Sequence, residues 1–121
     1  MANWLPVFLD DQIKLNDFGG SEYLINMLAE DGWTASLWQA RAELYRARGA
    51  PRDLVNAADF YSKAIVLEPS LAEAYRGLGL SLIKTGRSSE GKAALQHYLQ
   101  LKPTASDAAM IAITIASVGG N

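Results

Sequence analysis

Apolar residues recur every three to four positions along most of the chain, and no stretch keeps a regular alternation of apolar and polar residues. The first pattern is typical of helices that bury one face, whereas alternation is typical of strands. Prolines and glycines divide the pattern into short segments. The sequence therefore predicts an all-α fold of about seven helices. Their predicted ranges are 3–16, 21–30, 35–48, 53–67, the segment between Ser70 and Gly86, 89–101, and 104 or 105 to 117.

The clearest predicted helix ends flank the fifth segment. Ser70 can cap the first free amides, and Glu73 can return the bond as in a capping box. Gly86 is expected to end this helix, because glycine accepts the left-handed conformation at a helix C-terminus without steric cost.

Two adjacent segments repeat the same order of large and small side chains, interrupted only by a three-residue extension at 50–52. The aligned pairs are Trp38 with Tyr75, Ala42 with Gly79, Gly49 with Gly86, Tyr61 with Leu95, Ala64 with Tyr98, Leu67 with Leu101 and Pro69 with Pro103. Small residues allow two helices to approach closely, and aromatic side chains fill the space beside them. The repetition therefore predicts stacked antiparallel helix pairs.

These positions resemble the tetratricopeptide repeat, a helix pair with a 34-residue pattern. The matching residues are Trp38, Ala42, Tyr45, Ala57, Tyr61, Ala64 and Pro69 in the first segment, and Tyr75, Leu78, Gly79, Leu82, Gly91, Leu95, Tyr98 and Pro103 in the second. Two residues depart from the pattern. Arg41 replaces a leucine and must find a partner for its charged head, and Tyr98 replaces an alanine.

The resemblance implies one domain over 1–121, a right-handed superhelical stack or α-solenoid. Its parts would be a degenerate repeat at 1–34, a repeat with a three-residue insertion at 35–71, a repeat at 72–105 and a capping helix at 106–118. The last helix is apolar on nearly every face, although a capping helix normally shows water a polar side. The stretch YLQLKPTASDAAM resembles repeats common in bacterial tetratricopeptide proteins, so we expect a bacterial source.

Composition and charge narrow the classes of function. The 121 residues carry a formal net charge of −2, so no sequence-wide positive field attracts nucleic acid. No cysteine is present, which excludes disulfides, thiolate chemistry and cysteine zinc sites. No apolar stretch has the ~20 residues of a membrane span, and the start of the chain is unlike a signal peptide. We therefore expect a cytoplasmic protein without a membrane span or nucleic-acid partner.

The octapeptide GRSSEGKA, at 86–93, is the strongest candidate for catalytic chemistry, because its glycines and Lys92 resemble a phosphate-binding loop. Ala93, however, stands where the magnesium-binding hydroxyl belongs. Within the repeat pattern Gly86 lies at the turn between helices and Gly91 at a tight helix contact. His97 is the single histidine and has no companion ligands. We therefore expect no catalytic residues, metal site or cofactor, and no enzymatic activity.

The resemblance also implies a concave groove, lined by the first helix of each repeat, that binds a peptide or a protein surface. The groove residues would be Gln39, Glu43, Arg46, Arg76, Leu80, Ile83 and Lys84. Leu80 and Ile83 would anchor apolar side chains, and the cationic residues would bind carboxylates or carbonyls. The expected function is a non-catalytic protein-interaction module.

An alternative function is self-association. The apolar last helix would pack against a twin, forming a homodimer, or against another part of a larger protein of which this chain is the tail. The residues that would form this contact are Met110, Ile111, Ile113 and Ile115.

Overall fold

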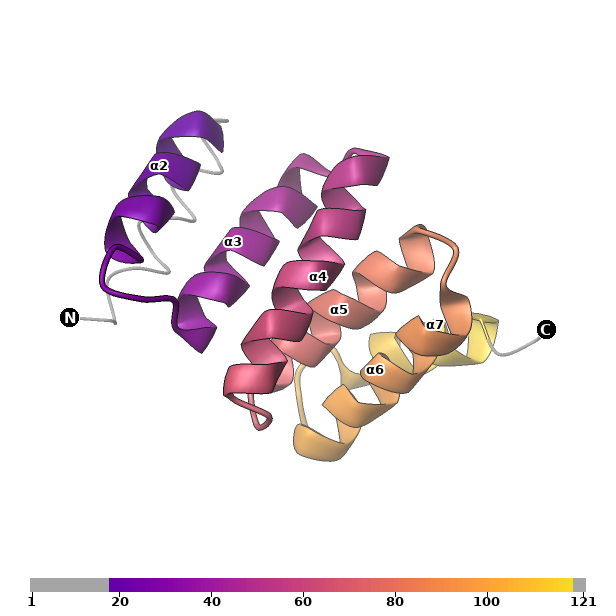
Figure 1. The fold of residues 1–121 in the computed structure, drawn as a ribbon. Coiled ribbons are helices and arrows are strands. Elements are labelled where there is room, and N and C mark those ends of the chain that lie inside the picture. Colours follow the sequence, from indigo (N-terminus) through magenta and orange to yellow (C-terminus); the bar gives the residue numbers. More distant parts are fainter. Residues whose placement is uncertain (1–17, 119–121) are drawn as a thin grey trace.

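The computed structural model describes residues 18–118, and within this range the chain is all-helical, with six helices and no strand (Figure 1). The helices are α2 (Phe18–Leu28), α3 (Ala35–Arg48), α4 (Pro51–Leu67), α5 (Ala72–Lys84), α6 (Ser88–Leu101) and α7 (Ala108–Val118). The all-α prediction is confirmed. The predicted helix over 3–16 lies outside the described residues. No helix within 18–118 has the length and apolar character needed to cross a bilayer.

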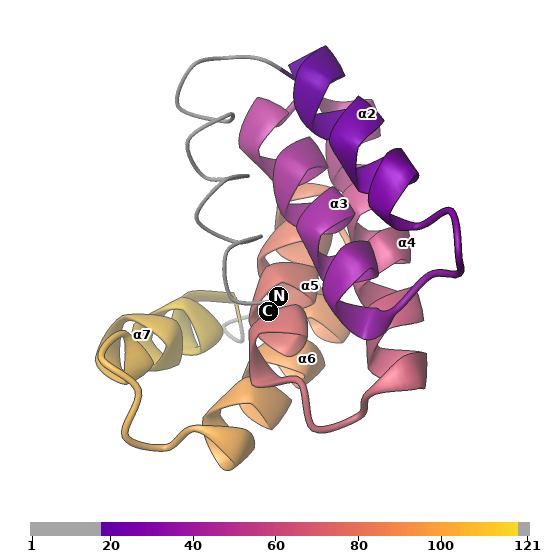
Figure 2. The same cartoon turned by 90° about the vertical axis from the view of Figure 1, so that its left-hand side faces the viewer.

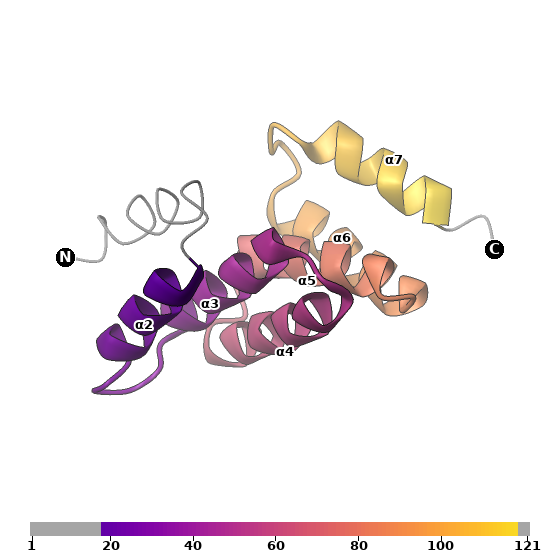
Figure 3. The same cartoon turned by 90° about the horizontal axis from the view of Figure 1, so that it is seen from above.

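The helices pack mainly against their neighbours in the sequence. α3 packs against α4, α4 against α5, and α5 against α6, while α3 also touches α5. Two views show α4 and α7 on opposite sides of the molecule, with α3 and α5 between them (Figures 2 and 3). α7 packs against α6. The face that α3 and α5 turn away from α4 therefore has α7 at one end.

Glycines at the ends of α3 and α5 adopt the left-handed conformation that the sequence predicts for Gly86. Gly49 has φ 77° and follows α3, and Gly86 has φ 87° and follows α5. At the other end of α3, the amide of Leu37 donates to Thr34 Oγ1 at 3.2 Å. These ends fix the short turns between paired helices.

The predicted capping box at Ser70 is wrong. The residue in the N-cap position of α5 is Leu71, and no side chain caps that end. Leu71 packs against the apolar cluster between α4 and α5, and its amide donates to the carbonyl of Glu68 at 3.1 Å. Burial of the leucine thus starts the helix one residue later than a serine cap would.

Three other helices begin away from their predicted positions. α4 starts at Pro51 rather than Asp53, because proline suits a first turn and the Asp53 carboxylate accepts from the Ala50 amide at 3.2 Å. The extension at 50–52 is therefore largely the first turn of α4. α2 already includes Phe18, the first described residue, ahead of the predicted start at Ser21. α7 starts at Ala108, and the residues after Pro103 form turns before it.

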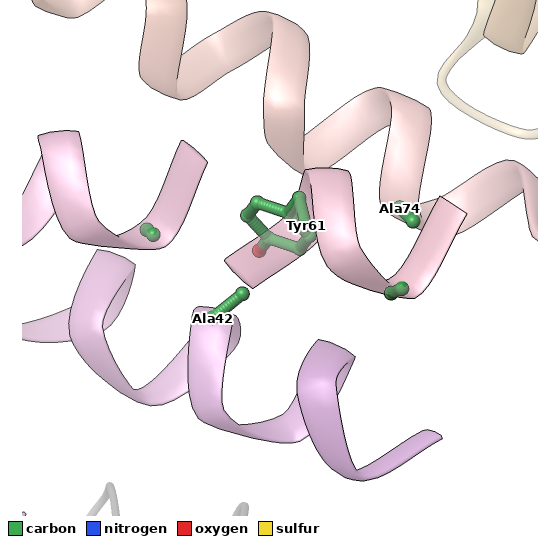
Figure 4. Close-up of a cluster of buried hydrophobic side chains, with 5 residues drawn as sticks. Ala42, Tyr61 and Ala74 are labelled. Atoms are coloured by element: carbon green, nitrogen blue, oxygen red, sulfur yellow. The ribbon is translucent and has the colours of Figure 1, made fainter. Parts of the chain in front are cut away.

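The core consists of three clusters of buried apolar side chains along the stack. The first joins α2 to α3 through Ile25, Leu37 and Leu44. The central cluster contains Ala42, Ala57, Tyr61, Ala64 and Ala74, and Figure 4 shows side chains from three helices converging on Tyr61. The third joins α5, α6 and α7 through Ala72, Leu95, Tyr98 and Ile111. Small residues at the repeated positions therefore lie where helices meet.

Two glycines bring α5 and α6 into backbone contact. A Cβ atom added to Gly79 would lie 2.6 Å from the Leu95 side chain, and one added to Gly91 would lie 2.7 Å from the Gly79 carbonyl oxygen. The predicted tight contact at Gly91 is thus confirmed. Gly77 has a similar constraint that the sequence pattern did not indicate: its Cβ would lie 2.1 Å from Tyr61 Cζ.

Candidate functional site

The predicted groove residues of α3 lie on a partly buried, polar surface. Gln39, Glu43 and Arg46 are all half-buried. Arg46 Nη2 donates to Glu43 Oε1 at 2.7 Å, and Arg46 Nε donates to the Tyr61 hydroxyl at 3.0 Å. The guanidinium is therefore held in a fixed position by two partners from α3 and α4.

Burial and neighbouring charges keep Tyr61 and Arg46 each in one protonation state. Burial is the main cause that raises the pKa of Tyr61, and the nearby Glu43 charge adds to it. Burial by itself would lower the pKa of Arg46, but Tyr61 and Glu43 outweigh it and raise that pKa. Arg46 is therefore a permanent cation and Tyr61 a neutral phenol at any physiological pH.

The predicted groove residues of α5 lie at the end that α7 occupies. Arg76 Nε donates to Asp107 Oδ2 at 2.5 Å, immediately before α7. Leu80 and Ile83 pack against the apolar cluster that includes Ile111 of α7. Lys84 is exposed at the end of α5. Three of the four α5 residues therefore take part in the packing around α7.

Asp107 is the polar centre of this region. Its carboxylate accepts from Arg76 and, at 2.6 Å, from the Tyr98 hydroxyl. The hydrogen bonds from Tyr98 and Arg76 lower the pKa of Asp107. The bond to Asp107, together with burial, raises the pKa of Tyr98 to about 12. Asp107 is therefore an anion bound between α5 and α6.

The four candidate residues for self-association divide between two faces of α7. Ile111 is only 2% exposed and lies in the third core cluster, against which Ile115 also packs. Met110 and Ile113 are 67% and 66% exposed. Internal packing therefore explains the apolar residues on one face of α7, while those on the other face are exposed to solvent.

Arg41 finds the partner that its departure from the repeat pattern requires. Its Nη2 donates to Glu22 Oε2 at 3.2 Å, so α3 is tied to α2. The guanidinium carbon also lies 4.5 Å from the centre of the Phe60 ring, a cation–π arrangement. The Tyr45 hydroxyl donates to the same Glu22 oxygen. The charged head of Arg41 thus has an internal partner, whereas its buried Nε has no hydrogen-bond partner among the described residues.

A hollow that the sequence did not indicate lies on the face of α4 and α6. It has a volume of about 660 Å³. Its lining includes Val55 and Asp59 from α4, Leu78 from α5 and His97 from α6. The His97 ring stacks on Tyr75 with 4.0 Å between ring centres. No local pattern in the sequence indicates this contact, because it depends on how α5 packs on α6.

The octapeptide is a turn followed by a helix. Helix α5 rather than a strand precedes Gly86, and the helix α6 begins at Ser88. The Arg87 guanidinium donates to both carboxylate oxygens of Glu90, at 3.1 and 2.6 Å. Gly91 packs tightly against α5 and is therefore not part of an open phosphate-binding loop. Within residues 18–118 no group of three or more His, Cys, Asp or Glu side chains could hold a metal ion.

Comparison with known proteins identifies no relative of this chain. The sequence matches no protein-family model and no curated protein.

Proposed function

We propose that this chain is a tetratricopeptide-like interaction module, a right-handed superhelical stack that binds a partner protein without catalysis. The helix pairs support this proposal. α3 and α5 begin at the first position of the two aligned repeats, and α4 and α6 end at the aligned residues Leu67 and Leu101. Ala42, Ala57 and the Gly79–Gly91 pair lie where close helix contact is expected.

The observation that carries the binding proposal is the adjacency of α3 and α5. Contact between the two helices sets α3, which carries the fixed Arg46–Glu43 pair and the half-buried Gln39, beside α5, which carries Arg76 and Leu80. Such a mixed face suits a peptide that offers carboxylates and an apolar anchor. We propose affinities near the micromolar range, about 8 kcal/mol. The bacterial source, the cytoplasmic location and the absence of nucleic-acid binding stay predictions.

Site-specific photocrosslinking in a native lysate tests which face binds. A benzophenone amino acid at Gln39 should capture a partner. The same group at Val66, which is 80% exposed on α4, is the matched control and should not. A third position, Asn56, reports on the hollow between α4 and α6. Capture at Asn56 without capture at Gln39 would contradict the groove assignment.

A second candidate function is self-association through α7. It is favoured by the exposure of Met110 and Ile113 on the same helix. Adjacent exposed apolar side chains are typical of an interaction surface. In this arrangement the outer face of α7 would pack against a second copy, while Ile111 stays in the core.

A further inference from the structure

We propose that α7 is a displaceable internal ligand of the α5–α6 face, and that a partner helix of the same chemistry takes its place. The proposal rests on the proposed function and names the partner of the part of that surface that α5 provides. The partner would be an amphipathic helix with a carboxylate at its start and branched apolar side chains four and eight positions later.

The spacing comes from α7 itself. Asp107, Ile111 and Ile115 follow one another at intervals of four, and the Ile111 amide donates to the Asp107 carbonyl at 2.9 Å. These residues therefore share one side of the first turns. Each is used: Asp107 binds Arg76 and Tyr98, and both isoleucines belong to the third cluster.

The receiving surface contains residues that the resemblance to the repeat family implies for ligand binding. Arg76 supplies the cation for the carboxylate, and Leu80 and Ile83 pack in the cluster that Ile111 completes. α7 thus already makes the kind of contact expected of a bound peptide. Its exposed residues Met110 and Ile113 take no part in this contact.

Few contacts hold α7 in place, so another helix could replace it. The helix has 11 residues, and Ile111 is its one fully buried side chain. A helix this short is marginally stable in water without tertiary contacts. The residues between α6 and α7 form turns rather than a helix. Release of Asp107, Ile111 and Ile115 would therefore free α7 and uncover the α5–α6 face.

A fluorescent peptide with the sequence of residues 104–118 is the probe, and it is titrated against the full chain. The wild-type chain should bind it weakly, because its own α7 competes. The Asp107→Asn chain should bind it at least about ten-fold more tightly, because the resident helix is weakened while Arg76 and Tyr98 remain. The Arg76→Gln chain should not gain this affinity, since it has lost the cation that the peptide needs.

The comparison of Asp107→Asn with Arg76→Gln separates recognition of the peptide from simple destabilisation of α7. Both substitutions remove the same ion pair, so a purely structural role predicts equal effects in the two chains. Hydrogen exchange should be faster in α7 of both variants and unchanged in α3, which also shows that the chains are folded. Asp59→Asn, at an exposed pair with Lys63, is the control and should bind the peptide like wild type.

Three results would overturn the proposal: equal binding by wild type and Asp107→Asn, equal binding by Asp107→Asn and Arg76→Gln, or unchanged exchange in α7. Dimerisation of Asp107→Asn that the peptide blocks would assign the surface to α7 of a second copy and would also overturn it. Crosslinking at Gln39 is independent of these readouts, so failure of the exchange would leave the proposed function standing.

Discussion

Tyr61 links three successive helices at one point. It belongs to α4, its hydroxyl accepts from Arg46 of α3, and its ring lies against Gly77 of α5. The side chain is fully buried. A single residue therefore joins the two aligned repeats, and the packing depends on the missing side chain at position 77.

Gly77→Ala should lower the free energy of unfolding by about 1–3 kcal/mol, the usual cost of an overpacked core. The added methyl would need to displace the Tyr61 ring, which the hydrogen bond to Arg46 holds in place. Urea denaturation measures the change. Gly19→Ala in α2 is the control, because a Cβ there would meet no other part of residues 18–118 within 4 Å outside its chain neighbours and the backbone of its own helix. Equal stability of Gly77→Ala and wild type would contradict the tight packing of the Tyr61 ring on Gly77.

At the scale of the element, the turn between α3 and α4 is held by a buried carboxylate. Arg48 donates to both oxygens of Asp53, at 2.8 and 2.7 Å, and the Ala50 amide adds a third bond. The hydrogen bond from Arg48 lowers the pKa of Asp53, although burial opposes it. Arg48 and Asp53, on either side of the inserted residues, thus hold the turn together.

Because the folded-state pKa of Asp53 is lowered, its carboxylate stabilises the fold above the unfolded pKa of about 3.9. This stabilisation is lost as the pH falls through the lower folded value. The free energy of unfolding should therefore decrease between about pH 5 and pH 2, and Asp53→Asn should reduce this slope. Arg48→Gln should reduce it similarly, since it removes the donor. Chemical denaturation at several pH values measures both, and an unchanged slope in Asp53→Asn would contradict the assignment.

The sequence predicted helices better than it predicted contacts between distant residues. The helical pattern, the glycine turn at Gly86 and the close approach at Gly91 depend on local spacing, and all three are confirmed. The need of Arg41 for a partner was predictable, but its identity, Glu22, depends on how α2 packs. The ion pair between Arg76 and Asp107 joins residues 31 positions apart, which no local pattern specifies.

At the scale of the whole molecule, the stack ends in a helix that is apolar on both sides. Its inner side completes a core cluster, and its outer side presents Met110 and Ile113 to solvent. A monomer normally has few such adjacent side chains at an end. The open side of α7 is therefore the surface on which assembly should depend.

If α7 mediates self-association, sedimentation velocity should show the weight-average mass rising with concentration. The double substitution Met110→Gln and Ile113→Gln should abolish this rise, because it removes apolar area without touching the buried Ile111. Val66→Gln is the matched control and should behave as wild type, since Val66 is exposed on α4. A mass that stays at 13.1 kDa over the whole range would contradict self-association.

The backbone contact between Gly79 and Gly91 allows α5 and α6 only one register. A Cβ atom added at Gly91 would lie 2.7 Å from the Gly79 carbonyl oxygen and 2.7 Å from the Ile83 side chain, so sliding one helix by a turn would break a close fit on both sides. The same register sets Arg76 and Tyr98 at the separation that one carboxylate can bridge. The absence of side chains at Gly79 and Gly91 therefore determines where α7 is anchored.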